Sequence, residues 1–428
     1  MAIIIIFLTF ENPEAYLDER SYIFNTKAFN DYIYEICYKK PIYCFIFSVR
    51  NYTDLVEYYG IQLSNLGFDK IENFLKKEFP KDYIFYYRNA RFIIFGDKNT
   101  DWNEISDRLH RYFSSQWSPS GKEIFLEINT GVISLENMNS SAYNITRLFN
   151  EAFASIDSSS QNPIIYFNDS NIEEIITENA IRHALESAIE NDSVEVFLQP
   201  IIEAKTRMVA GAEALARIRY PDGKIIPPGL FIPVAEKNGR INQLGRQVFR
   251  KCCEFIKDYD LESMNLSFIN INLSPLQFMR TDLNKTLVKF ANETGADISL
   301  IHLEITEESM IDEQLMNNQI TALTQLGFKF VLDDYGKGYS NMARLRKTPF
   351  INIKLDMSIV WDYCNNPDQL LPNEIKAFSE LGFDITAEGI ENEEMANTMA
   401  DLGCTYLQGY YFSKPLSLQD FVAKYTKK

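Results

Sequence analysis

The chain of 428 residues has few of the side chains that bind zinc or build disulfide frameworks. It contains 3 histidines and 6 cysteines, and no two cysteines stand in CxxC spacing. A structural zinc site or a disulfide scaffold needs such residues in clusters. We therefore interpret the cysteines as reduced thiols and expect a cytoplasmic protein.

Basic residues are also fewer than acidic residues. Lys and Arg number 42 against 59 Asp and Glu, which gives a formal net charge of −17 and a pI near 4.8. This charge excludes broad attraction to nucleic acid polymers or to anionic lipids. An anionic ligand would need local Arg or Lys residues, or a metal ion, to offset the field.

Long hydrophobic runs are missing as well. The one candidate, residues 2–10, is too short to span a bilayer and lacks the basic flank and small cleavage residues of a signal peptide. We interpret it as a buried strand. The alternative is the remnant of a membrane helix, which would make this chain the cytoplasmic part of a membrane-anchored protein.

The sequence does have enough apolar material for two globular domains, because 46% of its residues are hydrophobic. Residues 157–170 are rich in turn formers and mark the boundary. We place the first domain at 1–170 and the second at 171–428. An amphipathic helix is predicted at 171–190, and it could transmit the state of one domain to the other. Its apolar side is formed by Ile172, Ile175, Ile176, Ala180, Leu185 and Ile189.

The second domain contains a series of apolar runs that predict β-strands. They lie at 194–198, 208–213, 268–272, 298–304, 328–334, 351–354, 384–388 and 405–408. Stretches long enough for helices separate most of them, such as 239–257, 312–326 and 373–381. This alternation is typical of a parallel sheet and suits a (β/α)8 barrel, a TIM-like α/β fold whose chemistry lies at the carboxyl ends of the strands.

Acidic or amide side chains close several of these runs. They are Glu213, Asn272, Glu304, Asp333, Asp334 and Glu388. In parallel strands these groups would gather at one rim, where carboxylate and amide oxygens suit hard divalent cations. Two such ions need at least one bridging carboxylate, which the adjacent aspartates could supply. A single acid after a strand is usually only solvated, but several in register predict a metal site.

Two further features lie near this rim. Lys354 ends another strand, and its ammonium group could hold a water or stabilise charge on a phosphoryl oxygen. The loop at 335–340 has a glycine on each side of Lys337, which permits close backbone approach and movement over a site. A plain turn between strand and helix is the alternative for this loop.

Seven motifs resemble those of the EAL domain family of cyclic di-GMP phosphodiesterases, and they occur in the family order. They are EALAR (213–217), INLSPLQF (271–278), LEITEES (303–309), LDDYGKGYS (332–340), IKLD (353–356), AEGIE (387–391) and QGYYFSKP (408–415). The resemblance extends over residues 172–425 or so. It implies a barrel that hydrolyses cyclic di-GMP to linear 5'-pGpG with two Mg2+ or Mn2+ ions. Ca2+ is expected to inhibit, because it prefers more ligands and longer bonds.

The resemblance also implies roles for individual residues. One metal would be bound by Glu213, Asn272, Glu304 and Asp333, and the other by Asp333, Asp334 and Glu388. The catalytic set would be Lys354, Glu388 and Glu213, with Lys354 positioning or deprotonating the attacking water. Substrate contacts would come from Gln199, Arg217, Asp356, Glu391 and Gln408. Glu307 would brace the 335–340 loop.

Two positions depart from the family pattern. Lys337 stands where the family usually has Thr or another small residue, and Tyr335 replaces the usual Phe. Neither is among the expected metal ligands. The departures therefore bear on closure of the loop and on its coupling to a dimer.

The first domain has a different predicted order. Helices are expected near 26–38, 61–78, 101–114 and 143–156, and strands at 42–48, 83–87, 91–95 and 123–134. This βαββαβ order suggests an α+β sandwich with a mostly antiparallel sheet. Together with NTKAF (25–29) and SVRNYTDLVEYYG (48–60), it resembles the GGDEF diguanylate cyclase family.

The residues that carry cyclase chemistry in that family are missing here. Ser48 stands where the family has a metal-binding Asp, and RNARF (88–92) stands where the GGDEF hairpin should lie. A cyclase needs a carboxylate for Mg2+ and glycines that let the nucleotide approach. We therefore expect a degenerate GGDEF-like domain that makes no cyclic di-GMP. It would serve in dimerisation and regulation, or bind GTP as an allosteric effector, with Arg88 and Arg91 as candidate phosphate contacts.

The leading interpretation is thus a cyclic di-GMP phosphodiesterase with an inactive regulatory domain, and the family implies a homodimer. The alternative is a receptor that binds the dinucleotide without hydrolysis. Such silent relatives usually lose one or more acids, and none of the expected acids is missing. An unrelated barrel hydrolase that acts on another phosphoester would not explain the remaining motifs.

Overall fold

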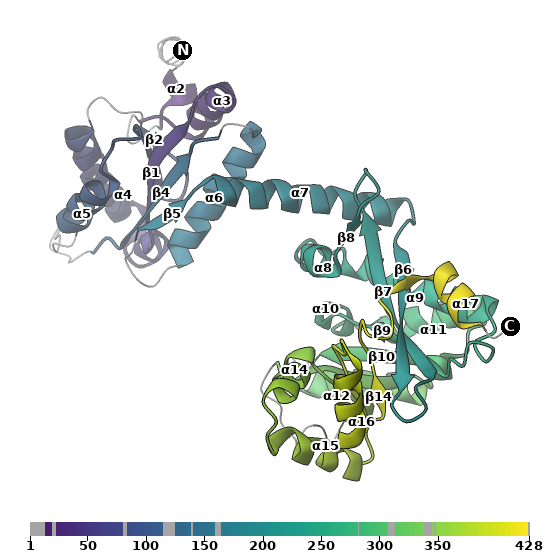
Figure 1. Cartoon of the computed structure of the whole chain (residues 1–428). Coiled ribbons are helices and arrows are strands. Elements are labelled where there is room, and N and C mark those ends of the chain that lie inside the picture. Colours follow the sequence, from purple (N-terminus) through teal and green to yellow (C-terminus); the bar gives the residue numbers. More distant parts are fainter. Residues whose placement is uncertain are drawn as a thin grey trace. The chain divides into compact units, whose positions relative to one another are not determined.

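The computed structural model describes residues 13–18, 23–79, 84–113, 125–137, 140–158, 164–280, 282–306, 313–337, 345 and 348–426. The chain divides into two compact units, Met1–Asn179 and Ala180–Lys428 (Figure 1). Among the described residues, no helix has the length and apolar character needed to cross a membrane. The apolar segment at 2–10 lies outside the described part.

The first unit is built on a mostly antiparallel sheet in the order β2-β3-β1-β4-β5. Its strands are β1 (Ile42–Val49), β2 (Ile84–Tyr86), β3 (Arg91–Phe95), β4 (Ile128–Leu135) and β5 (Ile165–Phe167). The β4–β5 pair is parallel and the other pairs are antiparallel. Its helices are α2 (Pro13–Tyr16), α3 (Thr26–Ile36), α4 (Tyr52–Glu78), α5 (Trp102–Phe113) and α6 (Ala142–Ser158). The structure has the predicted βαββαβ order, followed by the additional strand β5.

Both faces of this sheet are covered by helices. In β1, Cys44 and Ile46 pack with residues of α3 and α6, whereas Phe45 and Phe47 pack with residues of α4 and α5. Successive side chains of a strand point to opposite faces, so a strand covered on both sides has to be apolar throughout. This explains why the run at 42–48 shows no alternation of polar and apolar residues.

Helix α7 (Asp169–Glu190) contributes to both units. Ile172 and Ile175 belong to the core of the first unit, and Leu185 belongs to the core of the second. Ile176 and Ala180 were predicted on the apolar side of this helix, but Ile176 is 37% exposed and Ala180 is exposed too, so these two assignments are wrong. The two compact units divide inside α7, at Asn179.

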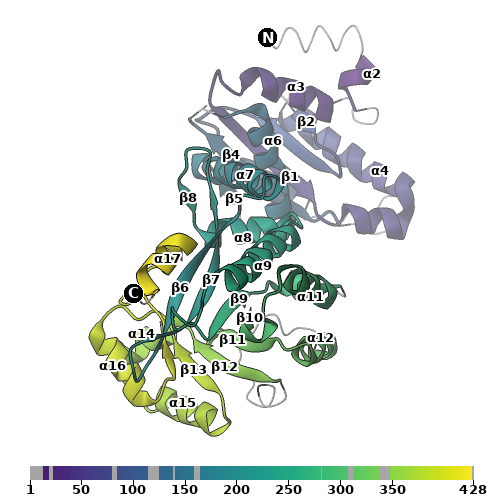
Figure 2. The same ribbon diagram turned by 90° about the vertical axis from the view of Figure 1, so that its right-hand side faces the viewer.

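The second unit is a closed barrel, which confirms the predicted TIM-like fold (Figure 2). Around the barrel its strands are β6 (Glu195–Glu203), β14 (Tyr406–Leu407), β13 (Asp384–Ala387), β12 (Phe350–Leu355), β11 (Lys329–Tyr335), β10 (Ile301–Thr306), β9 (Phe268–Asn272) and β7 (Val209–Arg219). The β6–β7 pairing closes the ring. The short strands β8 (Ile225–Ile226) and β15 (Leu416–Ser417) pair with β7 and β6.

Helices follow most of the strands. They are α8 (Pro228–Lys237), α9 (Ile241–Asp258), α10 (Pro275–Phe278), α11 (Leu283–Thr294), α12 (Glu313–Gln325), α14 (Met357–Asn365), α15 (Leu370–Glu380), α16 (Glu393–Leu402) and α17 (Leu418–Tyr425), with a 3-10 turn, η2, at Ile298–Leu300. Among them, α9 packs on β6 and β7, and α12 packs on β11. The helices therefore cover the outside of the barrel and leave its interior to the strand side chains.

The sequence-based expectation of an all-parallel barrel is wrong for β6. This strand runs antiparallel to both of its neighbours, β7 and β14. Only residues 204–208 connect β6 to β7, and a parallel crossover needs a dozen or more residues. The strand β7 also continues to Arg219, so Glu213 lies in the middle of a strand and does not end one.

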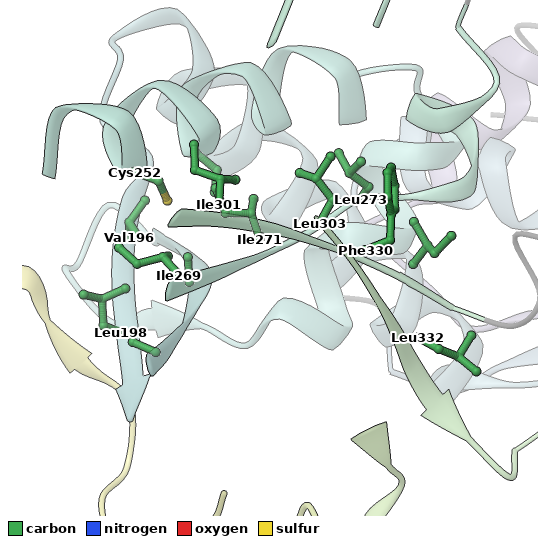
Figure 3. Packing of buried hydrophobic residues seen from close by; sticks show 14 of the residues in the cluster. Val196, Leu198, Cys252, Ile269, Ile271, Leu273, Ile301, Leu303, Phe330 and Leu332 are labelled. Atoms are coloured by element: carbon green, nitrogen blue, oxygen red, sulfur yellow. The ribbon is translucent and has the colours of Figure 1, made fainter. Parts of the chain in front are cut away.

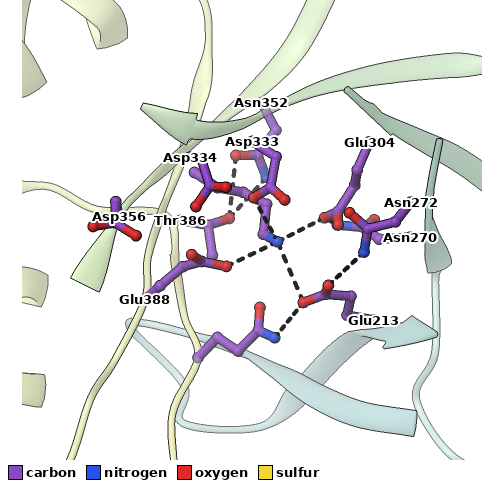
Figure 4. A network of polar contacts seen from close by, with 12 residues as sticks. Glu213, Asn270, Asn272, Glu304, Asp333, Asp334, Asn352, Asp356, Thr386 and Glu388 are labelled. Carbon is purple, nitrogen blue, oxygen red and sulfur yellow. Dashed lines mark hydrogen bonds and ion pairs between the residues drawn. The ribbon is translucent and has the colours of Figure 1, made fainter. Parts of the chain in front are cut away.

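Alternation along the strands separates the barrel's core from its interior. In β9, Ile269 and Ile271 pack outward in the same cluster as Cys252 of α9 (Figure 3). The intervening Asn270 and the terminal Asn272 point the other way, into the barrel (Figure 4). Outward apolar packing therefore fixes which side chains face the barrel's interior.

Candidate metal centre

Lys354 of β12 lies at the centre of a cluster of carboxylates inside the barrel. Figure 4 shows the four acids of this cluster. Its side chain is 1% exposed. The Nζ atom is 2.8 Å from Glu388 Oε1, 2.9 Å from Asp333 Oδ1, 3.0 Å from Glu304 Oε1 and 3.3 Å from Glu213 Oε2. One ammonium group thus neutralises part of the charge of four carboxylates.

The carboxylates come from different strands that the barrel aligns. Glu213 lies on β7, Glu304 on β10 and Asp333 on β11, and Glu388 follows β13. The pairing places Glu304 opposite Asn272 and Thr306 opposite Asp333. The register of neighbouring strands therefore brings residues far apart in the sequence to one level of the barrel.

Amide side chains orient two of the carboxylates. Asn272 Nδ2 donates to Glu213 Oε1 at 2.7 Å, and Gln408 Nε2 donates to Glu213 Oε2 at 2.7 Å. Asn270 Nδ2 donates to Glu304 Oε1 at 2.6 Å. Asn270 was not among the residues predicted from the sequence, although it lies two positions before Asn272 and the period of a strand puts both on the same face.

Burial and mutual repulsion raise the pKa values of three of the acids. Burial raises the pKa of Glu388 to about 8 and also raises that of Asp333, in both cases against the attraction of Lys354. The pKa of Glu304 is raised most clearly, by burial and by the nearby Glu213. Glu213 is the exception: burial opposes its ionisation, but Lys354 and the two amide donors lower its pKa overall.

The donor set fits hard divalent cations. Asp333, Asp334 and Glu388 each offer a carboxylate oxygen, and these atoms lie within 4.8 Å of one another. In the described part of the chain, Glu304 Oε2 is buried without a hydrogen-bond partner. The residues of this cluster offer carboxylate and amide oxygens and include no histidine or cysteine. Such ligands are typical of Mg2+, Mn2+ or Ca2+ sites.

Asp334 lies at the outer edge of this cluster. Its φ of 57° is unusual for a residue other than glycine, and this turn at the end of β11 lets both adjacent aspartates face the interior. Lys337 Nζ contacts Asp334 Oδ1 at 2.6 Å and Asp356 Oδ2 at 2.9 Å. Asp356 also caps α14, because its side chain accepts a hydrogen bond from the Ser358 backbone at 3.0 Å.

The remaining predicted residues lie at different distances from the cluster. Gln199 is buried and directly opposite Glu213 on the neighbouring strand. Arg217 is half-buried on the same strand as Glu213, and its guanidinium lies 5.5 Å from the ring centre of Phe197. Glu391 is exposed and has no contact with the cluster among the described residues, but it lines a surface pocket of about 300 Å³ beside Trp361. Glu307 lies outside the described residues.

In the first unit, Ser48 and Arg91 meet on the same carboxylate. Ser48 Oγ donates to Asp157 Oδ1, and Arg91 donates to Asp157 Oδ2 from Nε at 3.1 Å and from Nη2 at 2.6 Å. Arg88 Nη2 contacts Asn150 Oδ1 at 3.3 Å. The two arginines considered as phosphate contacts thus already have protein partners.

Comparisons with known proteins agree with this geometry. Residues 182–415 match the EAL domain family. Over 276 residues the chain is 31% identical to the cyclic di-GMP phosphodiesterase PdeL of Escherichia coli, covering 64% of this chain and 75% of PdeL. It is 32% identical over 240 residues to the signaling protein YkoW of Bacillus subtilis, covering 55% of this chain and 30% of YkoW. The chain spans from about a third to half of the length of the first curated relatives it matches.

Solved structures give the same result. The PaMucR phosphodiesterase in complex with c-di-GMP superposes with a TM-score of 0.53 at 28% identity, covering 56% of this chain and 98% of that structure. Vibrio cholerae LapD, solved as S helix, GGDEF and EAL parts, shares the fold over 93% of this chain and 96% of its own, with a TM-score of 0.52 and 16% identity. With the family match over its barrel and the carboxylate cluster inside it, this chain belongs to the EAL domain family.

Proposed function

We propose that this protein is a metal-dependent phosphodiesterase that hydrolyses cyclic di-GMP to linear 5'-pGpG. The observation that carries the proposal is the gathering of Glu213, Glu304, Asp333 and Glu388 around Lys354. The choice of cyclic di-GMP as substrate is supported by the name of PdeL and by the ligand bound in the PaMucR complex. Purely structural clusters seldom leave a buried carboxylate oxygen without a partner, as Glu304 does here.

The chain's own residues have separable roles in this reaction. Two bound Mg2+ or Mn2+ ions would lower the pKa of the attacking water and offset charge on the phosphodiester. Glu213, Asn272, Glu304, Asp333, Asp334 and Glu388 would hold these ions. Lys354 would position or deprotonate the water, and Glu388 would share in accepting its proton.

The substrate would lie across the rim next to these groups. Arg217 has a planar fork of donors that suits a phosphodiester, and Gln199 lies opposite Glu213. Gln408 and Asp356 are buried at the same rim, whereas Glu391 in its surface pocket would contact a guanine that extends outward. Ca2+ is expected to inhibit, because it prefers longer bonds and more ligands than the smaller Mg2+ ion does.

For the first unit we propose a regulatory GGDEF-like domain without cyclase activity, placed at residues 1–170 before an EAL domain at 171–428. The LapD likeness supports the fold of this unit. Asp157 pairs with Arg91 and Ser48 in the area where a cyclase would need a metal-binding carboxylate. A role in homodimerisation, in the cytoplasm, is preferred over binding of GTP as an effector.

The test is direct. Purified protein is incubated with cyclic di-GMP and Mn2+ or Mg2+, and the product is followed by chromatography. The expected product is pGpG, and Glu213→Gln should lower the rate at least about 100-fold, because it removes a charged ligand at the reacting centre. Circular dichroism of the variant should be unchanged. Tight binding of cyclic di-GMP without pGpG would reject the enzyme and identify a receptor instead.

A further inference from the structure

Lys337 brings a second ammonium group to the carboxylate cluster, from the solvent side. Its side chain is 54% exposed, whereas its partners Asp334 and Asp356 are 33% and 3% exposed. The contacts are short, at 2.6 Å and 2.9 Å. Lys354 neutralises the buried end of the cluster, and Lys337 neutralises its outer edge.

The backbone holds Lys337 in this place. Asp334 and Gly336 both have positive φ, 57° and 103°, and the Lys337 N–H donates to the Asp334 carbonyl at 3.3 Å. The next strand is tied to the same turn, because the Asp356 N–H donates to the Tyr335 carbonyl at 3.2 Å. The tight turn thus returns the chain toward Asp334, and the lysine reaches both aspartates from it.

Asp334 also lies close to Asp333 and Glu388, and the carboxylate oxygens of these three residues are near enough to one another to hold a divalent cation. The ammonium group donates to Asp334 Oδ1 at 2.6 Å, so it draws on the same negative charge that a metal ion bound to Asp334 would need. A divalent ion next to Asp334 would also lie a few ångströms from the positive charge of Lys337 and be repelled by it.

We propose that Lys337 is a tethered competitor for the divalent cation at Asp333, Asp334 and Glu388, so that its ammonium group and this ion compete for the charge of Asp334. The inference rests on the metal site of the proposed function. Asp356 gives the displaced ammonium a second partner. The lysine therefore weakens one of the two metal sites and makes occupancy of that site depend on the concentration of the ion.

The experiment is calorimetric titration of Mn2+ into the metal-stripped full-length protein. In Lys337→Met the weaker Mn2+ binding step is expected to tighten about three- to tenfold, because one positive charge near the ion is removed. Lys376→Met is the matched control. Lys376 has the same charge, is 75% exposed on α15 and pairs at 4.0 Å with Glu380, away from the cluster. Its Mn2+ affinities should equal those of the wild type.

Each outcome decides the question. Unchanged or weaker Mn2+ binding in Lys337→Met, with unchanged circular dichroism, overturns the proposal. Equal tightening in Lys376→Met also overturns it, since the effect would then be one of net charge. Hydrolysis of cyclic di-GMP is measured separately. If the protein hydrolyses cyclic di-GMP but Lys337→Met and the wild type bind Mn2+ equally, only the role of Lys337 as a competitor is rejected. If Lys337→Met binds Mn2+ more tightly but the protein does not hydrolyse cyclic di-GMP, only the proposed function is rejected.

Discussion

At the scale of single residues, Lys354 is buried among four acids of the barrel. It is 1% exposed and its Nζ lies within 3.3 Å of four carboxylates. Burial alone would lower the pKa of Lys354, but Asp333, Glu213 and the other acids raise it well above its usual range. In the absence of metal, this ammonium group is what allows the acids to share one small space.

Replacing Lys354 by Met should therefore destabilise the metal-free protein. We expect a loss of about 3 kcal/mol or more in the free energy of unfolding, because buried carboxylates lose their counter-ion. Mn2+ should stabilise this variant more than it stabilises the wild type, since the ion then supplies the missing positive charge. Urea denaturation with EDTA or with Mn2+ measures both effects. Equal stabilisation of the two proteins by Mn2+ would contradict this account of the site.

At the scale of elements, the short strand β14 ties the end of the barrel to the site. Gln408 follows this strand and donates to Glu213 Oε2, and the next residue, Gly409, packs against the backbone of Ile390. A Cβ atom on Gly409 would lie 2.1 Å from the carbonyl oxygen of Ile390. Backbone atoms cannot move aside as a flexible side chain can.

Gly409→Ala should lower the free energy of unfolding by about 1 to 3 kcal/mol, the usual cost of overpacking. It should also weaken Mn2+ binding by displacing Gln408 from Glu213. Gly229→Ala is the control, because a Cβ there meets nothing within 4 Å, and it should be neutral or stabilising by less than about 1 kcal/mol. Chemical denaturation of both variants checks the difference. Similar denaturation midpoints for the two variants would show that the close approach of Gly409 to Ile390 does not limit the stability of the protein.

Most of the barrel could be predicted from the sequence because its apolar runs follow the period of strands and its acids occupy inward positions. The direction of β6 required attention to the short connection at 204–208, which has no room for a helix. The contact of Lys337 with Asp334 and Asp356 could not be predicted, because it depends on positive φ values at Asp334 and Gly336. Gly336 permits such a turn, but nothing in the sequence places a positive φ on Asp334.

At the scale of the whole molecule, helix α7 is shared between the two compact units. Ile181 and Leu185 in its second half are buried in the barrel core at 3% and 0% exposure. Its last turn is tied to α9 as well, since Gln247 Nε2 donates to the Ile189 carbonyl at 2.7 Å. The barrel therefore needs the second half of a helix whose first half belongs to the other unit.

A fragment of residues 169–428 should unfold in a single cooperative transition. A fragment of residues 191–428 should be less stable by several kcal/mol, because each large aliphatic side chain of α7 contributes about 1.5 to 3 kcal/mol through its burial. Urea denaturation of the two purified fragments compares them. Equal midpoints would show that α7 is dispensable for the barrel.

Closure of the barrel joins segments made at very different times during synthesis. β14 pairs with β6, and Gln408 reaches back to Glu213 across 195 positions of sequence. A ribosome exposes β6 and β7 long before residues 406–408 emerge. Through that interval Glu213 lacks one of its amide donors and the ring is open, so a nascent chain cannot yet assemble the carboxylate cluster. Binding of the proposed metal ions would thereby be postponed until the barrel's last strand has been translated.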